Sequence, residues 1–273
     1  MSQIVRRIPL PFQGNKSKHI DNFINYITNC PANTYIDLFG GSCYLSYVIH
    51  RLKPQAHVIC NDYDNYRERL ANINTTNEIL DKIKAITTTK HNTKYTQEQS
   101  QQIKDIINEY IASEKFIDSI TLSACLCFSG NYHTTTDKLL SLPFFYNTLP
   151  KNHYNTKSYL EALNGIEFTK KDWKELFNEY KDKPNICFIA DPPYLGTDKS
   201  SYSNNYWKLR DSLDTIKILK QPYFVYYTSE KSELVELIDY FYGETITYNK
   251  QTIQRSGLNR DAKQWLDIML TNK

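Results

Sequence analysis

The chain has 273 residues, of which 40% are apolar and 23% are charged, and this composition excludes collagen-like, low-complexity and wholly disordered proteins. The length predicts one large domain that carries an insertion. Apolar runs are short, whereas a membrane-spanning helix needs about 20 apolar residues, and the residues after Met1 lack the apolar stretch of a secretory signal. We therefore expect a cytoplasmic protein without a membrane partner.

The net charge is only +3, but the positive residues gather in segments 1–20 and 250–263, which contain a single acid, Asp261. These segments predict two basic patches, which suit either a polyanionic partner or a solvated surface. The six cysteines lie in apolar contexts at irregular spacing. We expect them to be reduced and buried rather than paired in disulfides or bound to zinc.

Five short apolar runs predict β-strands, over residues 35–39, 57–60, 186–190, 223–227 and 265–270. Amphipathic patterns predict a helix over 44–50 and another at about 231–241. Short apolar strands separated by helices imply a parallel sheet that is covered on both faces. Ligands bind at the carboxyl ends of the strands in such sheets.

The pattern changes between residues 66 and 165. Isoleucines and leucines recur at helical spacing over 73–86 and again over 103–111, with a polar stretch between them. An aromatic, turn-rich stretch over 128–159 follows, and its pattern predicts no particular element. Residues 66–165 are therefore expected to form a mostly helical insertion into an α/β domain.

The run Asp191-Pro192-Pro193-Tyr194 follows a predicted buried strand. The exocyclic amino group of a base is a poor nucleophile because its lone pair is delocalised into the ring. The Asp191 carboxylate and the Pro192 carbonyl can accept its N–H hydrogens and so favour attack by the nitrogen. The prolines make the turn rigid, and Tyr194 offers a flat face for stacking. The same four residues are also ordinary turn formers at the end of a strand.

The run 37–41, Asp-Leu-Phe-Gly-Gly, ends the first predicted strand. Its glycines permit the backbone to approach a ligand closely, although it does not match the dinucleotide fingerprint G-x-G-x-x-G. Asp62 ends the next strand, where an acid can bind both hydroxyls of a ribose. Asp62 can equally serve as the N-cap of a helix over 63–71. Together the two features suit an adenosine-type cofactor without a pyrophosphate.

The segment 12–17, Phe-Gln-Gly-Asn-Lys-Ser, superficially resembles a phosphate-binding loop. Pro9 stands where that loop requires glycine, so an NTPase site is excluded. Lys16 offers a cation and Phe12 an apolar face, which suit a cofactor that carries a carboxylate. A basic surface loop is the alternative interpretation.

Taken in chain order, segment 12–16, segment 37–41, the pair Asn61-Asp62 and segment 191–194 resemble the Dam-like, D12-type DNA N6-adenine methyltransferases. The resemblance continues into residues 255–261, which are similar to the family's late loop. It implies a Rossmann-like methyltransferase sheet with helices on both faces, formed by residues 1–65 and 166–273. It also implies that residues 66–165 are an inserted target-recognition domain, and that the methyl donor is S-adenosylmethionine.

The resemblance also implies roles for individual residues of this chain. The positions that contact the cofactor are Phe12, Gly14, Lys16, Asp37, Phe39, Gly41, Asp62 and Asp191. The catalytic motif comprises Asp191, Pro192, Pro193 and Tyr194. The partner is double-stranded DNA in a bacterial or phage-infected cell, and the enzyme is expected to act as a monomer or weak dimer.

Two features depart from the family pattern. Cys43 stands where the family usually has the last glycine of its glycine-rich turn, which questions the tightness of that turn. Residues 125–165 contain no arginine, the usual reader of guanine, so GATC specificity does not transfer and a short or relaxed recognition context is expected. The candidate DNA-binding residues are Asn131, His133, Lys138, Lys151, Arg255 and Arg260.

The resemblance implies direct methyl transfer to a flipped base, with no metal and no covalent enzyme intermediate, and residues 196–206 are expected to close over that base. Cytosine C5 chemistry is excluded because the sequence has no Pro-Cys dipeptide before a nucleophilic cysteine. Cytosine N4 transfer, RNA methylation and a catalytically silent DNA-binding relative remain open alternatives.

Overall fold

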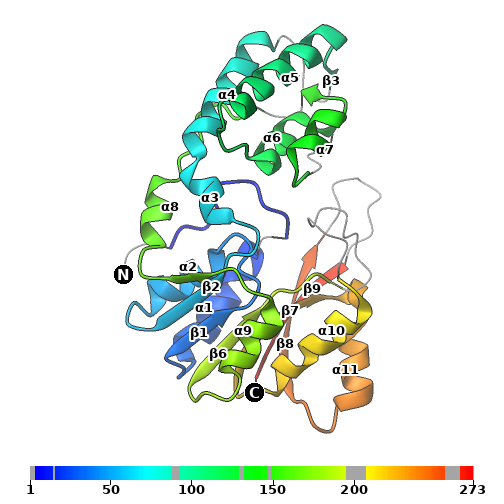
Figure 1. Ribbon diagram of the computed structural model, residues 1–273. Coiled ribbons are helices and arrows are strands. Elements are labelled where there is room, and N and C mark those ends of the chain that lie inside the picture. Colours follow the sequence, from blue (N-terminus) through cyan, green and yellow to red (C-terminus); the bar gives the residue numbers. More distant parts are fainter. Residues whose placement is uncertain are drawn as a thin grey trace.

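The computed structural model describes residues 4–14, 16–87, 93–128, 132–146, 149–194, 207–255 and 265–272, without the side chain of Arg255. The chain forms two parts, a sheet with helices on both faces and a mostly helical insertion above the edge where the parallel strands end (Figure 1). This arrangement confirms the predicted α/β fold class. None of the helices in the described ranges has both the length and the apolar character needed to cross a membrane.

The main sheet contains seven strands among the described residues, in the order β5-β2-β1-β6-β7-β9-β8. Their bounds are β1 (Thr34–Asp37), β2 (His57–Asn61), β5 (Glu167–Thr169), β6 (Ile186–Ala190), β7 (Tyr223–Ser229), β8 (Tyr248–Arg255) and β9 (Trp265–Asn272). The chain leaves β1 toward β2 on one side and returns to β6 on the other. The strand order therefore reverses between β1 and β6, which is the point where doubly wound sheets bind ligands.

All five predicted strands are present, but the sheet is parallel only from β5 to β7. The expectation of a parallel sheet was wrong for the predicted strand 265–270, because β9 pairs antiparallel with both β7 and β8. β8 and β9 follow one another among the described elements and pair along their full length, from Tyr248 opposite Asn272 to Arg255 opposite Trp265. The sequence pattern missed β8 because this edge strand is polar rather than apolar.

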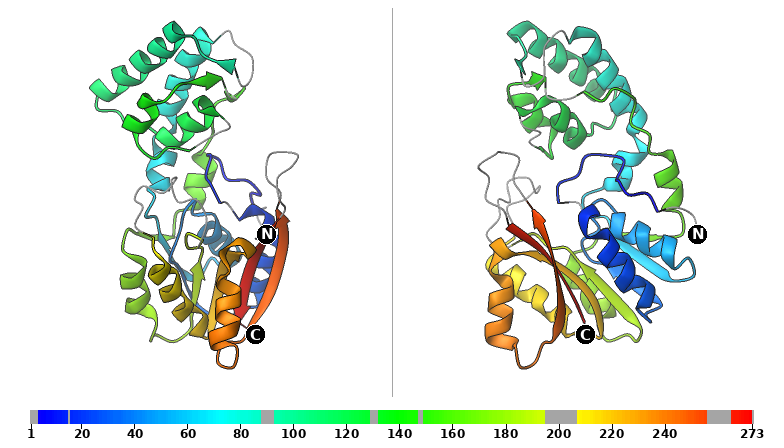
Figure 2. Two further views of the ribbon diagram at one scale, coloured as in Figure 1. Left: turned by 90° about the vertical axis from the view of Figure 1, so that its right-hand side faces the viewer. Right: turned by 180° about the vertical axis from the view of Figure 1, so that it is seen from behind.

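Helices cover both faces of the sheet. One face packs against α1 (Ile20–Asn29) and α2 (Tyr44–Leu52), and the other against α9 (Trp173–Tyr180) and α11 (Leu234–Tyr242). Figure 2 shows the two sets on opposite sides, with α10 (Leu209–Thr215) beside the second set. Successive strand residues point to opposite faces, so Tyr35 joins the first apolar cluster and Ile36 the second.

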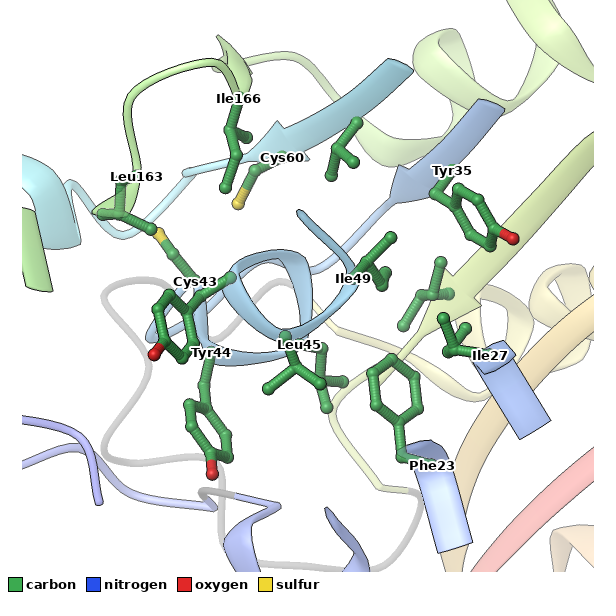
Figure 3. Packing of buried hydrophobic residues seen from close by; sticks show 14 of the residues in the cluster. Phe23, Ile27, Tyr35, Cys43, Tyr44, Leu45, Ile49, Cys60, Leu163 and Ile166 are labelled. Carbon is green, nitrogen blue, oxygen red and sulfur yellow. The ribbon is translucent and has the colours of Figure 1, made fainter. Parts of the chain in front are cut away.

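The first cluster packs around α2. Figure 3 shows Phe23 and Ile27 of α1 beside Leu45 and Ile49 of α2, below the strands. The four phenylalanine, isoleucine and leucine side chains are almost fully buried, and burial of each contributes about 1.5–3 kcal/mol. All six cysteines are buried and free, as the sequence predicted.

The insertion has an apolar core of its own, which runs from Ile79 to Leu149. Its elements are α4 (Ile73–Ile86), β3 (Thr93–Lys94), α5 (Gln97–Ala112), α6 (Ser119–Leu126), α7 (Thr136–Ser141) and β4 (Phe145–Tyr146). The two helical segments predicted from periodicity correspond to α4 and α5. A capping box between Thr96 and Gln99 begins α5.

Two short helices, α3 (Tyr66–Ala71) and α8 (Lys157–Ala162), join the insertion to the sheet. Both contribute to the core of the sheet domain, through Tyr66 and Tyr159. The separate core of the insertion therefore begins and ends inside the predicted limits 66–165, and the division of the chain at those limits stays a prediction.

A buried arginine connects the two parts. Arg69 of α3 donates to Asp118 at 2.9 Å and to the carbonyl of Pro11 at 2.8 Å. Asp118 is the N-cap of α6 in the insertion, and Pro11 belongs to the N-terminal segment, which runs below the insertion (dark blue in Figure 2). Both charged side chains are nearly inaccessible to solvent, 3% and 1% exposed.

Candidate active site

A cavity of about 630 Å³ opens at the carboxyl ends of the parallel strands. Segments that follow β1, β2, β5 and β6 line it, together with the N-terminal segment and the start of β9. The volume is typical of sites for small molecules and cofactors. Its position is the one expected for a doubly wound sheet.

The Asp-Pro-Pro-Tyr turn (191–194) lies in the wall of this cavity, directly after β6. Asp191 forms an ion pair with Lys16 through Oδ2, and 21% of its side chain is exposed. Surrounding protein raises the pKa of Asp191, because it disfavours the charged carboxylate, while the positive charge of Lys16 opposes this effect. The charge of Lys16 therefore favours the ionised form of the Asp191 carboxylate in this buried site.

Lys16 is itself buried, at 6% exposure. Its Nζ donates to the carbonyl of Gly14 at 2.6 Å as well as to Asp191. It also lies 5.4 Å from the ring centroid of Tyr194 and 5.5 Å from that of Tyr227. This one cation therefore connects the N-terminal segment to both ends of the Asp-Pro-Pro-Tyr turn.

The Tyr194 hydroxyl donates to Oδ1 of Asp267 at 3.1 Å. Asp267 belongs to β9 and is 4% exposed. Its Oδ2 lies 3.7 Å from Nε2 of His19, a fully buried residue of the short helix η1 (Ser17–His19). The sequence analysis did not select Asp267, although an acid inside the apolar run 265–270 was a usable signal.

The turn after β1 is tight despite its cysteine. Cys43 adopts the left-handed conformation with φ of 56°, and its N–H donates to the carbonyl of Gly40 at 2.7 Å. The left-handed conformation favours glycine, so Cys43 keeps the backbone of a glycine position and the turn stays tight. A Cβ on Gly40 would lie 2.8 Å from the Asn61 carbonyl oxygen, so this position requires glycine.

Asp37 is 1% exposed and accepts a hydrogen bond from the Ser46 hydroxyl at 2.8 Å. Burial raises its pKa to about 7, and the nearby negative charge of Asp191 adds to the effect. Phe39 and Gly41, which follow in the same turn, line the cavity, whereas Asp37 does not.

Asp62 caps a helix in this structure. Its carboxylate accepts the N–H groups of Tyr66 at 2.6 Å and Arg67 at 3.0 Å, the first two residues of α3. Asp62 is not among the residues that line the cavity, but Asp64 is. The helix begins at Tyr66 with Asn65 as its N-cap, so Asp62 accepts the first N–H groups of α3 from three residues before the N-cap position.

The other predicted cofactor positions, Phe12, Gly14, Lys16 and Asp191, all line the cavity. Aromatic residues that the sequence analysis did not select lie opposite them. Phe39 is in contact with Trp173 and Trp207, each with a centroid distance of 5.7 Å. Trp173 follows β5, and this strand of only three residues gave no recognisable pattern. The sequence therefore did not indicate that Trp173 lies at the carboxyl end of a strand.

The candidate DNA-binding residues within the described ranges, His133, Lys138 and Lys151, are not among the residues that line the cavity. Lys138 on α7 and Lys151 are exposed, and α7 lies on the side of the insertion that faces the sheet (Figure 1). His133 is half-buried, and burial together with the positive charge of Lys138 lowers its pKa. Outside the described parts lie Asn131, Arg260, the side chain of Arg255 and the predicted closing segment 196–206.

Comparison with known proteins identifies the family. A family model for the D12 class N6 adenine-specific DNA methyltransferase matches residues 12–253. A Haemophilus influenzae protein named "Putative methyltransferase" is 32% identical over 246 residues, which cover 86% of this chain and 80% of that protein. The solved precorrin-6y C5,15-methyltransferase of Geobacter metallireducens aligns with a TM-score of 0.41 and 7% identity, over 99% of this chain and 97% of that one, a likeness that supports no further conclusion. The chain belongs to the D12 class N6 adenine-specific DNA methyltransferase family.

Proposed function

We propose that this DNA adenine methyltransferase carries out its reaction in the cavity at the strand ends, by direct transfer of a methyl group to a base flipped out of the duplex. The observation that carries the proposal is the position of the Asp-Pro-Pro-Tyr turn in the wall of a 630 Å³ cavity, with Asp191 paired to a buried lysine. Membership of the family implies S-adenosylmethionine as the methyl donor.

The cavity residues suit that cofactor. The aromatic group of Phe39, Trp173 and Trp207 offers apolar faces to an adenine ring. Lys16 offers a cation to the carboxylate, and Asp64 offers an acceptor to hydroxyl groups. When bound, the cofactor supplies a methyl group on a positively charged sulfur, which makes that methyl electrophilic.

The protein's part is to hold and activate the base. The Asp191 carboxylate and the Pro192 carbonyl accept the N–H hydrogens of the adenine amino group, and these bonds strengthen as its nitrogen becomes positive. The ring of Tyr194 stacks on the base, which offsets part of the few kcal/mol that flipping costs. Most of the rate enhancement then comes from orientation and fixed charges.

The insertion is proposed as the target-recognition region, with DNA running between it and the sheet. Lys138, Lys151 and His133 would contact the duplex from the insertion, and Arg255 and Arg260 from the sheet domain. Lysine contacts to phosphates position the protein without reading sequence, so we propose methylation of adenine in a short or relaxed context. Action as a monomer or weak dimer is part of the proposal.

The decisive experiment expresses the chain in a host that lacks DNA methylation and maps modified bases across the genome. We expect N6-methyladenine with the wild type, none with Asp191→Ala, and wild-type levels with Asp182→Ala, a matched change at an exposed acid. N4-methylcytosine, methylated RNA without methylated DNA, or turnover of Asp191→Ala within about tenfold of the wild type would each overturn the proposal.

A further inference from the structure

The hydroxyl of Tyr194 is hydrogen-bonded to Asp267 of β9, a strand that is separated from β6 by β7 in the sheet. The donor and acceptor, Tyr194 Oη and Asp267 Oδ1, are 3.1 Å apart. Asp267 is an acid among the apolar residues 265–270 of β9, and it lines the cavity with a side chain that is 6% exposed. A buried carboxylate is costly unless hydrogen bonds satisfy it, so its presence at this position requires an explanation.

Asp267 is fixed in place on its other side. Its Oδ2 lies 3.7 Å from His19 Nε2, and the His19 ring meets Tyr227 edge-on at 5.5 Å. In the strand register, Asp267 is opposite Ser229, the last residue of β7, and opposite Ile253 of β8, so the strand is paired on both sides. The acceptor for Tyr194 therefore sits on a rigid strand and between two packed partners.

The tether also determines which face of the Tyr194 ring is available. Lys16 Nζ lies over one face of that ring, at 5.4 Å from the centroid, and in the proposed function the base stacks on the other face. A tyrosine ring free to turn about its side-chain bonds would not present that face constantly. A hydrogen bond at the hydroxyl end restricts this motion.

We propose that Asp267 is a positioning residue, which holds the ring of Tyr194 at the angle that the flipped base requires. The inference rests on the proposed function, in which Tyr194 stacks on the base. Asp267 acts only through Tyr194 and does not itself contact the reacting atoms. Misplacement of a positioned group by a fraction of an ångström lowers a rate without abolishing binding.

A double-mutant cycle tests the tether on a duplex that the wild type methylates. Tyr194→Phe removes only the hydroxyl, and Asp267→Ala removes only the acceptor. We expect each change to lower kcat about tenfold, the KM for S-adenosylmethionine to stay within about twofold, and the double variant to lose no more than either single one. Asp267→Asn, which keeps an acceptor oxygen, should retain at least about fivefold more activity than Asp267→Ala.

A spectroscopic measurement separates positioning from general damage. With 2-aminopurine in place of the target adenine, stacking on Tyr194 quenches the fluorescence of the flipped base. We expect brighter complexes for both Tyr194→Phe and Asp267→Ala than for the wild type, at equal occupancy of DNA. Unchanged fluorescence in Tyr194→Phe would contradict the proposal.

The proposal is also overturned if Tyr194→Phe turns over within about twofold of the wild type, a result that does not depend on how Asp267 variants fold. Losses that multiply in the double variant, or equal activity of Asp267→Asn and Asp267→Ala, would show that Asp267 is merely structural. The wild type and Asp191→Ala report on the proposed function, and the Tyr194 and Asp267 variants report on the tether, so each can fail without the other.

Discussion

Lys16 and Asp191 are 175 residues apart in the chain and form an ion pair in the cavity wall. The lysine belongs to the N-terminal segment, and the aspartate ends a central strand of the sheet. Because Lys16 is almost fully buried, its charge acts on Asp191 with little screening by solvent. The Asp191 carboxylate, which is proposed as catalytic, therefore gains its charge partner only when the N-terminal segment has packed across the strand ends.

The ion pair makes a prediction about pH dependence. Asp191 must be ionised to accept from the amino group, so the rate falls as the pH falls through its pKa, which surrounding protein raises. Lys16→Met removes the charge that opposes this rise, so the acidic limb of the kcat profile should move to higher pH. Single-turnover rates across pH measure the limb. Lys181→Met, at an exposed position, is the control, and a Lys16→Met profile that coincides with it would refute this role.

The raised pKa of Asp37 should make the stability of the protein depend on pH. Its pKa of about 7 in the folded protein is above its unfolded value, so between about pH 4 and pH 7 the folded state holds a proton that the unfolded state has lost. The stability from this group falls as the pH rises through that window, by at most about 1.4 kcal/mol per pH unit. Denaturant unfolding of Asp37→Asn should therefore show a gain over the wild type that grows from pH 5 to pH 7 and then levels off. A constant difference would argue against the raised pKa.

Substitutions at Asp62 and Asp64 should have different effects, one on stability and the other on cofactor binding. Asp62→Ala removes the acceptor for two N–H groups of α3 and should lower the free energy of unfolding by about 1–2 kcal/mol. Asp64→Ala should leave unfolding nearly unchanged but weaken S-adenosylmethionine binding by about 1–3 kcal/mol. Calorimetry and thermal denaturation of both variants provide the comparison. The assignment is reversed if Asp62→Ala alone loses cofactor affinity at unchanged stability.

The ion pair between Arg69 and Asp118 predicts a strong effect on stability. Removing one partner leaves a buried charge without its counterpart, so Arg69→Met or Asp118→Asn should each lower the free energy of unfolding by about 3–5 kcal/mol. Replacing both residues, as Arg69→Met with Asp118→Asn, which keeps a side-chain acceptor at the N-cap of α6, should cost less than the sum of the two single changes. Denaturant titration of the three variants checks this, and losses that simply add in the double variant would contradict the expected coupling.

The sequence by itself determined the features that depend on local chemistry. Apolar runs predicted the positions of β1, β2, β6, β7 and β9 because a strand buried on both faces must be continuously apolar. The glycines after β1 and the prolines after β6 predicted turns because few other residues adopt those backbone angles. Parallel strands end at the same edge of a sheet, so the two turns were predicted to lie together there. The ligand site was predicted at that edge for the same reason.

Only the tertiary structure decided which side chains meet there. Asp62 could have faced either a ligand or the start of α3, and the packing of α3 turned it toward the helix. The partners of Asp191 and Tyr194 come from Lys16 and from β9, far away in the chain. β8, a polar edge strand, has no apolar pattern in the sequence, yet it pairs antiparallel with β9, the strand that carries Asp267. Such contacts depend on how whole elements pack against one another, and no local pattern of residues encodes that geometry.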